Sequence, residues 1–163
     1  MIIRLARIED LPAINDIYNR VVEEKFCTAH LSPVSMEERE KWFSSHLPDR
    51  YPVFVSVEEK RITGWVSLGP YRADRQALKH VAEVSYYVDQ GFRGRGTGSG
   101  LLEYAIDTAP AFGISVLVAI LLSKNPASIA LLEKFGFVCW GSMPGIAKIG
   151  TETADHLYMG LKL

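Results

Sequence analysis

The stretch that decides the fold is Tyr86-Tyr87-Val88-Asp89-Gln90-Gly91-Phe92-Arg93-Gly94-Arg95-Gly96-Thr97-Gly98-Ser99-Gly100-Leu101-Leu102. It predicts a strand, a tight glycine-rich loop and the start of a helix. Glycines let a backbone approach an anion with no Cβ in the way. The free N–H groups and the dipole of the new helix favour negative charge at this point, and Arg93 and Arg95 add positive charge. The loop is therefore a candidate diphosphate site, unless its glycines serve only as a flexible connection.

Two other classes of phosphate-binding loop fit this stretch poorly. A dinucleotide-binding fold carries its glycines after the first strand, whereas these glycines follow the fourth predicted strand. The loop also lacks the Gly-Lys-Ser/Thr ending of a nucleoside-triphosphate loop. The pattern thus favours a different phosphate-containing ligand.

Hydrophobic periodicity on both sides of the loop predicts alternating strands and helices. Strands are expected near residues 2–6, 53–57, 62–68, 80–89, 114–121, 137–143 and 153–162. Helices are expected near residues 10–25, 35–46, 96–109 and 125–135. Asp10 is the predicted cap of the first helix, Ser35 opens the second in a capping box, and Gly136 closes the last. With no repeat or linker, the chain is expected to form one α/β domain over residues 1–163.

Composition narrows the class of protein. The chain has 163 residues and a formal net charge of −1, which argues against a dedicated nucleic-acid binder with a basic face. Its two cysteines, Cys27 and Cys139, form neither a CxxC pair nor a disulfide framework, and no metal site is expected. The charged N-terminal residues do not read as a signal peptide, and the longest apolar run is too short to span a bilayer. We therefore expect a cytoplasmic protein without membrane partners.

Two motifs resemble those of the Gcn5-related N-acetyltransferase (GNAT) family. Arg93-x-x-Gly96-x-Gly98 is similar to its pyrophosphate-binding motif. Asn125-Pro126-Ala127-Ser128, followed by Glu133-Lys134-Phe135-Gly136-Phe137, is similar to its late helix and turn. The resemblance extends over nearly the whole chain, with both motifs in the family's order. It implies an α/β (α+β) domain whose mixed, mostly antiparallel central sheet carries helices on both faces.

The resemblance also implies acetyl-CoA as cosubstrate. The residues that would bind it are Tyr86, Tyr87, Val88, Arg93, Gly94, Arg95, Gly96, Thr97, Gly98, Asn125 and Ser128. Members of this family part the strand before the loop from the next strand, which exposes main-chain groups to the pantetheine arm. A backbone N–H near Tyr87 or Val88 would then meet negative charge that develops on the thioester oxygen.

Acetyl transfer to an amine needs a base, because an alkylamine is mostly protonated at neutral pH. Glu83 is the candidate, since it lies on the strand that leads into the glycine loop and the family resemblance places the proposed base there. The alternative is a surface carboxylate paired with Lys79 or His80. Many relatives carry a tyrosine in the late helix as acid for the leaving thiolate, and here that position is Leu132.

Several segments more specifically resemble the phosphinothricin and methionine sulfoximine acetyltransferase group, among them Ser67-Leu68-Gly69-Pro70-Tyr71-Arg72. The group's acceptors are small amino-acid-like amines with anionic groups, which arginine forks suit. Arg72 and Arg75 are the predicted acceptor-binding residues, although a charged loop can be merely solvated. The loop ending at His30 departs from the group, which leaves His30 as a surface residue.

Two further readings stay open at this point. The acceptor could be another amine, such as a polyamine or a protein N-terminus, or the chain could be an acyl-CoA-binding module without catalysis. Cys27 as a nucleophile has no positioned base beside it in the sequence. The resemblance further implies a homodimer, for which Trp42, Phe43 and Trp140 are candidate surface residues.

Overall fold

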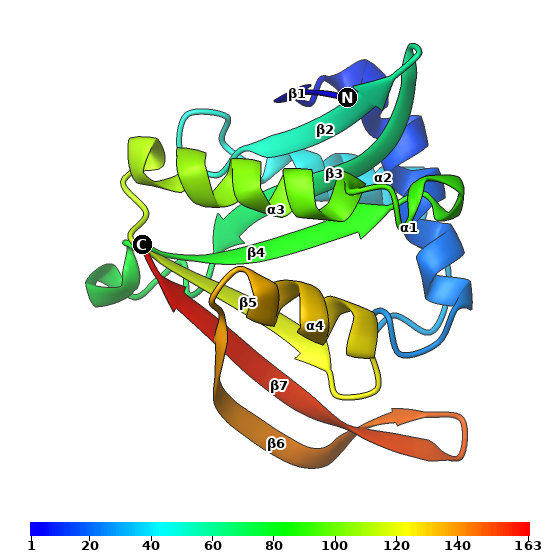
Figure 1. The fold of residues 1–163 in the computed structure, drawn as a ribbon, viewed down its shortest axis with the longest axis vertical. Coiled ribbons are helices and arrows are strands. Elements are labelled where there is room, and N and C mark those ends of the chain that lie inside the picture. The colour runs from blue at the N-terminus through cyan, green and yellow to red at the C-terminus, as the bar shows by residue number, and fades with distance from the viewer.

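Seven runs rich in β-branched and aromatic residues form one sheet in the computed structural model, which describes residues 1–163 (Figure 1). The strands in chain order are β1 (Ile2–Leu5), β2 (Val53–Glu58), β3 (Arg61–Pro70), β4 (Val81–Val88), β5 (Val116–Leu122), β6 (Val138–Ile149) and β7 (Glu152–Lys162). Across the sheet the order is β1-β2-β3-β4-β5-β7-β6, and β4–β5 is the one parallel pair. The predicted mixed, mostly antiparallel sheet is confirmed.

Four helices cover the sheet, two on each face (Figure 1). They are α1 (Leu11–Glu23), α2 (Met36–Ser44), α3 (Thr97–Thr108) and α4 (Pro126–Lys134). On one face α1 packs over Val53, Val55 and Trp65, while on the other face Leu101 and Leu102 of α3 pack over alternate strand residues. Each face therefore buries its own apolar layer, and the sheet lies between them. No helix is both long and apolar enough to cross a bilayer.

Of the three predicted helix caps, those at Ser35 and Gly136 are confirmed and that at Asp10 is wrong. Ser35 Oγ accepts a hydrogen bond from the Glu38 N–H at 3.2 Å, and the Glu38 carboxylate accepts one from the Ser35 N–H at 2.8 Å. Gly136 takes the expected positive φ of +83° after α4. Asp10 stands at the cap position of α1, but its carboxylate instead binds the Arg4 guanidinium and the Arg7 N–H in the preceding turn.

The sixth strand runs well past its predicted end at residue 143. Pro144 and Gly145 follow that residue, and proline cannot donate to a sheet ladder. β6 lies at the edge of the sheet, however, where a missing donor can face solvent. It passes these residues through a register shift between Met143 and Ala147 and pairs with β7 again up to Ile149.

The feature that creates the site is the parting of β4 from β5. The two strands pair only from Val81 to Glu83 of β4, against Val116 to Val118 of β5. Beyond Glu83 the strands run apart (Figure 1), so the β5-facing backbone edge of residues 84–88 has no strand partner. The main-chain opening that the family resemblance implied is therefore present, directly before the glycine loop.

Candidate active site

The glycine loop joins the start of α3 through two residues in the left-handed backbone conformation. Gly94 and Gly96 have φ of +72° and +88°, and Gly96 is the cap residue of α3. No heavy atom would lie within 4 Å of a Cβ added at either residue, so the space in front of the loop is open. Such angles cost L-residues roughly 1–2 kcal/mol, which explains why glycine occupies these two positions.

A cavity of about 520 Å³ lies in front of this loop. Among the residues that line it are Tyr86, Tyr87 and Val88 of β4, Arg93, Gly94, Gly96 and Gly98 of the loop, and Asn125 and Ser128 of the α4 start. These are all the predicted cofactor residues except Arg95 and Thr97. Open left-handed glycines and the amino end of a 12-residue helix fit a pyrophosphate, as the sequence indicated.

Arg95 and Thr97 lie outside the lining. The Arg95 guanidinium stacks on the Phe92 ring at 5.4 Å, and the buried Thr97 hydroxyl donates to the Phe92 carbonyl at 3.2 Å. Both side chains thus contact the loop itself. Their predicted contacts with the cosubstrate stay a prediction.

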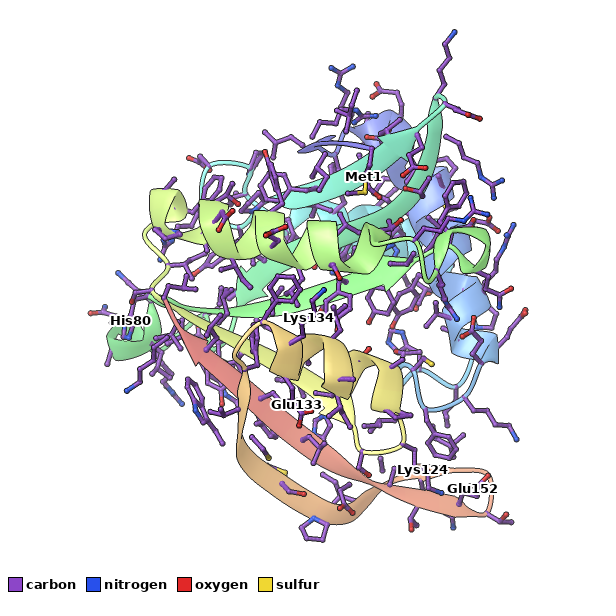
Figure 2. The ribbon with its side chains drawn as sticks, in the orientation of Figure 1. Met1, His80, Lys124, Glu133, Lys134 and Glu152 are labelled. Carbon is purple, nitrogen blue, oxygen red and sulfur yellow. The ribbon has the colours of Figure 1, made fainter.

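Sequence reasoning missed two polar residues of this cavity. Lys134 at the end of α4 donates to Ser99 of α3 at 3.4 Å, and Figure 2 labels Lys134 between these helices. It supplies a positive charge from the far wall. The family motif contained Lys134, but only the fold shows that α4 brings it opposite the glycine loop.

A second cavity, the acceptor-side cavity, has a volume of about 530 Å³ and lies on the side of the parted strands that α1 and α2 cover. Glu83, Ser85 and Tyr87 of β4 line it, together with Trp65 and Ser67 of β3, His156 of β7 and residues of α1, α2 and the loop between them. Alternation along β4 therefore sends Glu83, Ser85 and Tyr87 to this cavity, while Val84 enters the opposite core.

Glu83 is the last β4 residue that pairs with β5, so its carboxylate sits where the strands begin to part. Burial raises the pKa of this carboxyl above its ordinary value, and it forms no ion pair with any residue. The alternative pairing with Lys79 or His80 is absent from the structure. A raised carboxyl pKa in a cavity is typical of groups that exchange protons with a substrate.

The two cavities meet at Tyr87 and Cys27, which line both. Tyr87 is the one phenol common to the two cavities, and burial raises its pKa, so it stays protonated. Burial and the Glu24 carboxylate raise the pKa of the Cys27 thiol. A protonated thiol is a poor nucleophile, which weakens a covalent mechanism through Cys27.

The two arginines predicted to bind the acceptor do not line the acceptor-side cavity. Arg72 and Arg75 are exposed in the segment between β3 and β4, and the Arg72 guanidinium lies 5.5 Å from the Tyr71 ring. Their role stays a prediction. The arginine that does line the cavity is Arg39 of α2, which is only 3% exposed. Its position in a charged helix gave no sign of burial in the sequence.

His30 lines the acceptor-side cavity. It is exposed, but its Nδ1 lies 2.7 Å from the hydroxyl of Tyr18, which also contacts Thr28 at 2.8 Å. These contacts fix the loop that follows α1 against the helix. Leu132 is fully buried in the core and lines neither cavity, so this position of α4 offers no acid for a thiolate.

Comparisons with known proteins agree with this arrangement. A model of the acetyltransferase (GNAT) family matches residues 14–137. YwnH of Bacillus subtilis is 39% identical, over 100% of this chain and 99% of that protein. An L-methionine sulfoximine/L-methionine sulfone acetyltransferase of Pseudomonas aeruginosa is 34% identical, over 99% of this chain and 94% of its own. The structure of a Sinorhizobium meliloti phosphinothricin acetyltransferase with acetyl-CoA has a TM-score of 0.93 and 28% identity, over 99% and 88% of the chains.

Proposed function

This chain belongs to the acetyltransferase (GNAT) family, and we propose that it acetylates the amine of a small amino-acid-like acceptor of the phosphinothricin or methionine sulfoximine type. The family and the named relatives make it an acetyl-CoA-dependent N-acetyltransferase. One observation carries the choice of a small acceptor. The acceptor-side cavity is about 530 Å³, is walled by two helices and by Glu83, and meets the cavity in front of the glycine loop at Tyr87 and Cys27.

Acetyl-CoA supplies the acetyl group as a reactive thioester when it is bound. The open glycines Gly94 and Gly96, the start of α3 and Lys134 would hold its phosphates. The unpaired edge of β4 near Tyr87 and Val88 offers main-chain N–H groups to developing negative charge. These contacts are supported by the cavity lining and by the family motif.

Glu83 is the proposed general base. Its carboxylate removes the proton from the acceptor ammonium, directly or through a water, so that the neutral amine can attack. A carboxyl whose pKa is raised by burial is a stronger base than an exposed one. Direct transfer from one cavity to the other needs no covalent enzyme intermediate, which agrees with the protonated Cys27 thiol.

Release of the CoA thiol, measured with a panel of amines, tests the proposal. Phosphinothricin, methionine sulfoximine and methionine sulfone should be acetylated with a higher kcat/KM than spermidine or a peptide with a free N-terminus. A preference for the polyamine or the peptide would support the alternative acceptors. Binding of acetyl-CoA without turnover of any amine would identify a non-catalytic acyl-CoA-binding module.

A homodimer and a cytoplasmic location are parts of the same proposal. The edge strand β6 exposes four apolar side chains, Val138, Trp140, Met143 and Ile146, next to an unpaired backbone edge. A long apolar edge of this kind is a template for another chain. Trp42 and Phe43 pack on the α1 core and do not extend this surface. Free Cys27 and Cys139 support a reducing compartment.

A further inference from the structure

The acceptor-side cavity contains a buried cation with no acidic partner. Arg39 of α2 is 3% exposed, and no carboxylate lies within ion-pair distance of its guanidinium. Its neighbour Glu38 lines the same cavity, but the Glu38 carboxylate accepts hydrogen bonds from the N–H and the hydroxyl of Ser35 and forms no ion pair with Arg39. Buried charges are normally paired, so an isolated guanidinium in a cavity needs another explanation.

Uncharged side chains hold the guanidinium of Arg39 in place. Nε donates to Asn15 Oδ1 at 3.1 Å, and the guanidinium carbon lies 4.5 Å from the Tyr18 ring centre and 4.7 Å from that of Trp42. The two terminal nitrogens donate no hydrogen bond to the protein, yet no buried polar side-chain atom lacks a partner. Those nitrogens therefore open onto the cavity that Arg39 lines.

The aromatic rings and Asn15 also fix the direction of this fork. Asn15 Nδ2 donates to the Val34 carbonyl at 3.0 Å, which sets the amide so that its oxygen faces Arg39. A guanidinium with Nε occupied and both terminal nitrogens free has the geometry that binds an oxyanion through two parallel hydrogen bonds. The site is thus built for an anion before any ligand arrives.

Glu83 lines the same cavity on the sheet side, and burial alone accounts for its pKa shift. The cation and the carboxylate hence do not neutralise one another, and the cavity offers an anion receptor on α2 and a proton acceptor on β4. We propose that Arg39 binds an oxyanion of the acceptor, its carboxylate or a side-chain phosphinate, and so makes the enzyme select zwitterionic amines. This inference rests on the proposed function.

Three acceptors separate the two sources of oxyanion. Methionine sulfone carries a carboxylate only, phosphinothricin methyl ester carries a phosphinate only, and methionine sulfone methyl ester carries neither. Arg39→Met keeps an apolar stem against the rings and removes the fork. It should lower kcat/KM about 10- to 150-fold for whichever acceptor bears the recognised anion and leave kcat/KM unchanged for methionine sulfone methyl ester, which has no anionic group.

Lys41→Met is the matched control, because Lys41 is on the same helix but pairs with Glu37 at the surface. It should alter none of the three rates. Calorimetry with acetyl-CoA establishes that each variant is folded. Should Arg39→Met not fold, Arg39→Lys keeps a charge without the fork, and it should show a smaller loss confined to the same acceptor.

An equal fall in kcat/KM for all three acceptors, or no change for any, would overturn the inference and leave Arg39 a structural residue. That outcome differs from failure of the proposed function, in which the wild-type protein itself would acetylate none of the three. A loss for methionine sulfone alone assigns the carboxylate. A loss for phosphinothricin methyl ester alone assigns the phosphinate.

Discussion

Glu24 holds Arg93 by two hydrogen bonds, from Nη1 to Oε2 at 2.6 Å and from Nη2 to Oε1 at 2.9 Å. The same carboxylate accepts a hydrogen bond from Gln90 at 2.7 Å. The pair joins the residue that follows α1 to the glycine loop. Because both terminal nitrogens of Arg93 are engaged, the loop presents mainly its backbone and helix start to a phosphate.

Glu24→Gln should lower the melting temperature at neutral pH, since it removes this ion pair. Burial acts to raise the pKa of Glu24, but the hydrogen bonds from Arg93 and Gln90 lower it overall. A lowered pKa in the folded state stabilises the protein above the ordinary carboxyl pKa, and this contribution is lost as pH falls. The difference from wild type should therefore shrink towards acidic pH. Thermal unfolding from pH 4 to 8 measures it, with Glu37→Gln in an exposed pair as control.

Gly96→Trp should abolish acetyl-CoA binding, because its side chain would enter the open space in front of the loop. Backbone strain alone could weaken the protein, since Gly96 has a positive φ. Gly150→Trp is matched for strain, with a φ of +63° and no atom within 4 Å of an added Cβ, but it lies in the β6–β7 turn. Calorimetry should show binding for Gly150→Trp only. Normal affinity in Gly96→Trp would remove the loop from the site.

Glu83→Gln should keep acetyl-CoA affinity and lower kcat about 10²–10⁴-fold, the usual contribution of a general base. In the wild type, activity should fall at acidic pH with an inflection above the ordinary carboxyl pKa, because burial raises the pKa of Glu83. The variant should lack that inflection. Near-normal turnover in Glu83→Gln would remove this residue from the mechanism.

The same substitution should stabilise the fold at neutral pH. A carboxyl with a raised pKa in the folded state contributes its full stability below the unfolded pKa and loses it as pH rises through the folded pKa. A buried glutamine has no charge to desolvate. The variant should therefore melt at a higher temperature than the wild type at pH 7–8, and this difference should disappear near pH 4. An unchanged difference across this range would contradict the burial of an ionised carboxylate.

Arg72→Ala tests the arginines predicted from the sequence. If Arg72 binds the acceptor's carboxylate, the variant should narrow the kcat/KM gap between methionine sulfoximine and its methyl ester by slowing the acid alone. Lys60→Ala, in the turn between β2 and β3, should leave the gap unchanged. An unchanged gap in Arg72→Ala would confine anion recognition to residues that line the cavity.

Ile146→Glu should shift a homodimer towards an 18.2 kDa monomer, because it places a charge in the apolar edge of β6. Ile8→Glu is the control, since Ile8 is equally exposed, at 60%, but follows β1 at the opposite end of the sheet order. Sedimentation at micromolar concentration measures both. A wild-type protein that is monomeric there would refute the dimer.

The order and type of the elements could be predicted from the sequence because most of the strands and helices bury an apolar pattern, with α2 and β6 as exceptions. The strand end at β6 could not, because an edge strand tolerates Pro144 where a central strand does not. The glycine loop and Glu83 were found because their chemistry lies within one continuous segment, residues 83–98.

The acceptor side was predicted less well, because its wall is assembled from distant segments. Arg39 reads as one charge among many in a polar helix, and only the packing of α2 against Trp65 turns it inward. Lys134 likewise faces the glycine loop through the placement of α4 over the parted strands. Periodicity predicts which face of a helix is apolar, but it does not predict which cavity a charged residue on that face will enter.

Because β4 and β5 part, the centre of the sheet lacks interstrand hydrogen bonds beyond Glu83, whereas the centre of an ordinary sheet is its most continuous part. An extended ligand that lies along the free edge of β4 can form hydrogen bonds with its main-chain groups, as an added strand would. Any free energy gained in this way belongs to the folded state alone. The stability that joins the two halves of the sheet then rises with the concentration of acetyl-CoA. The free energy of unfolding therefore reports how much acetyl-CoA is present.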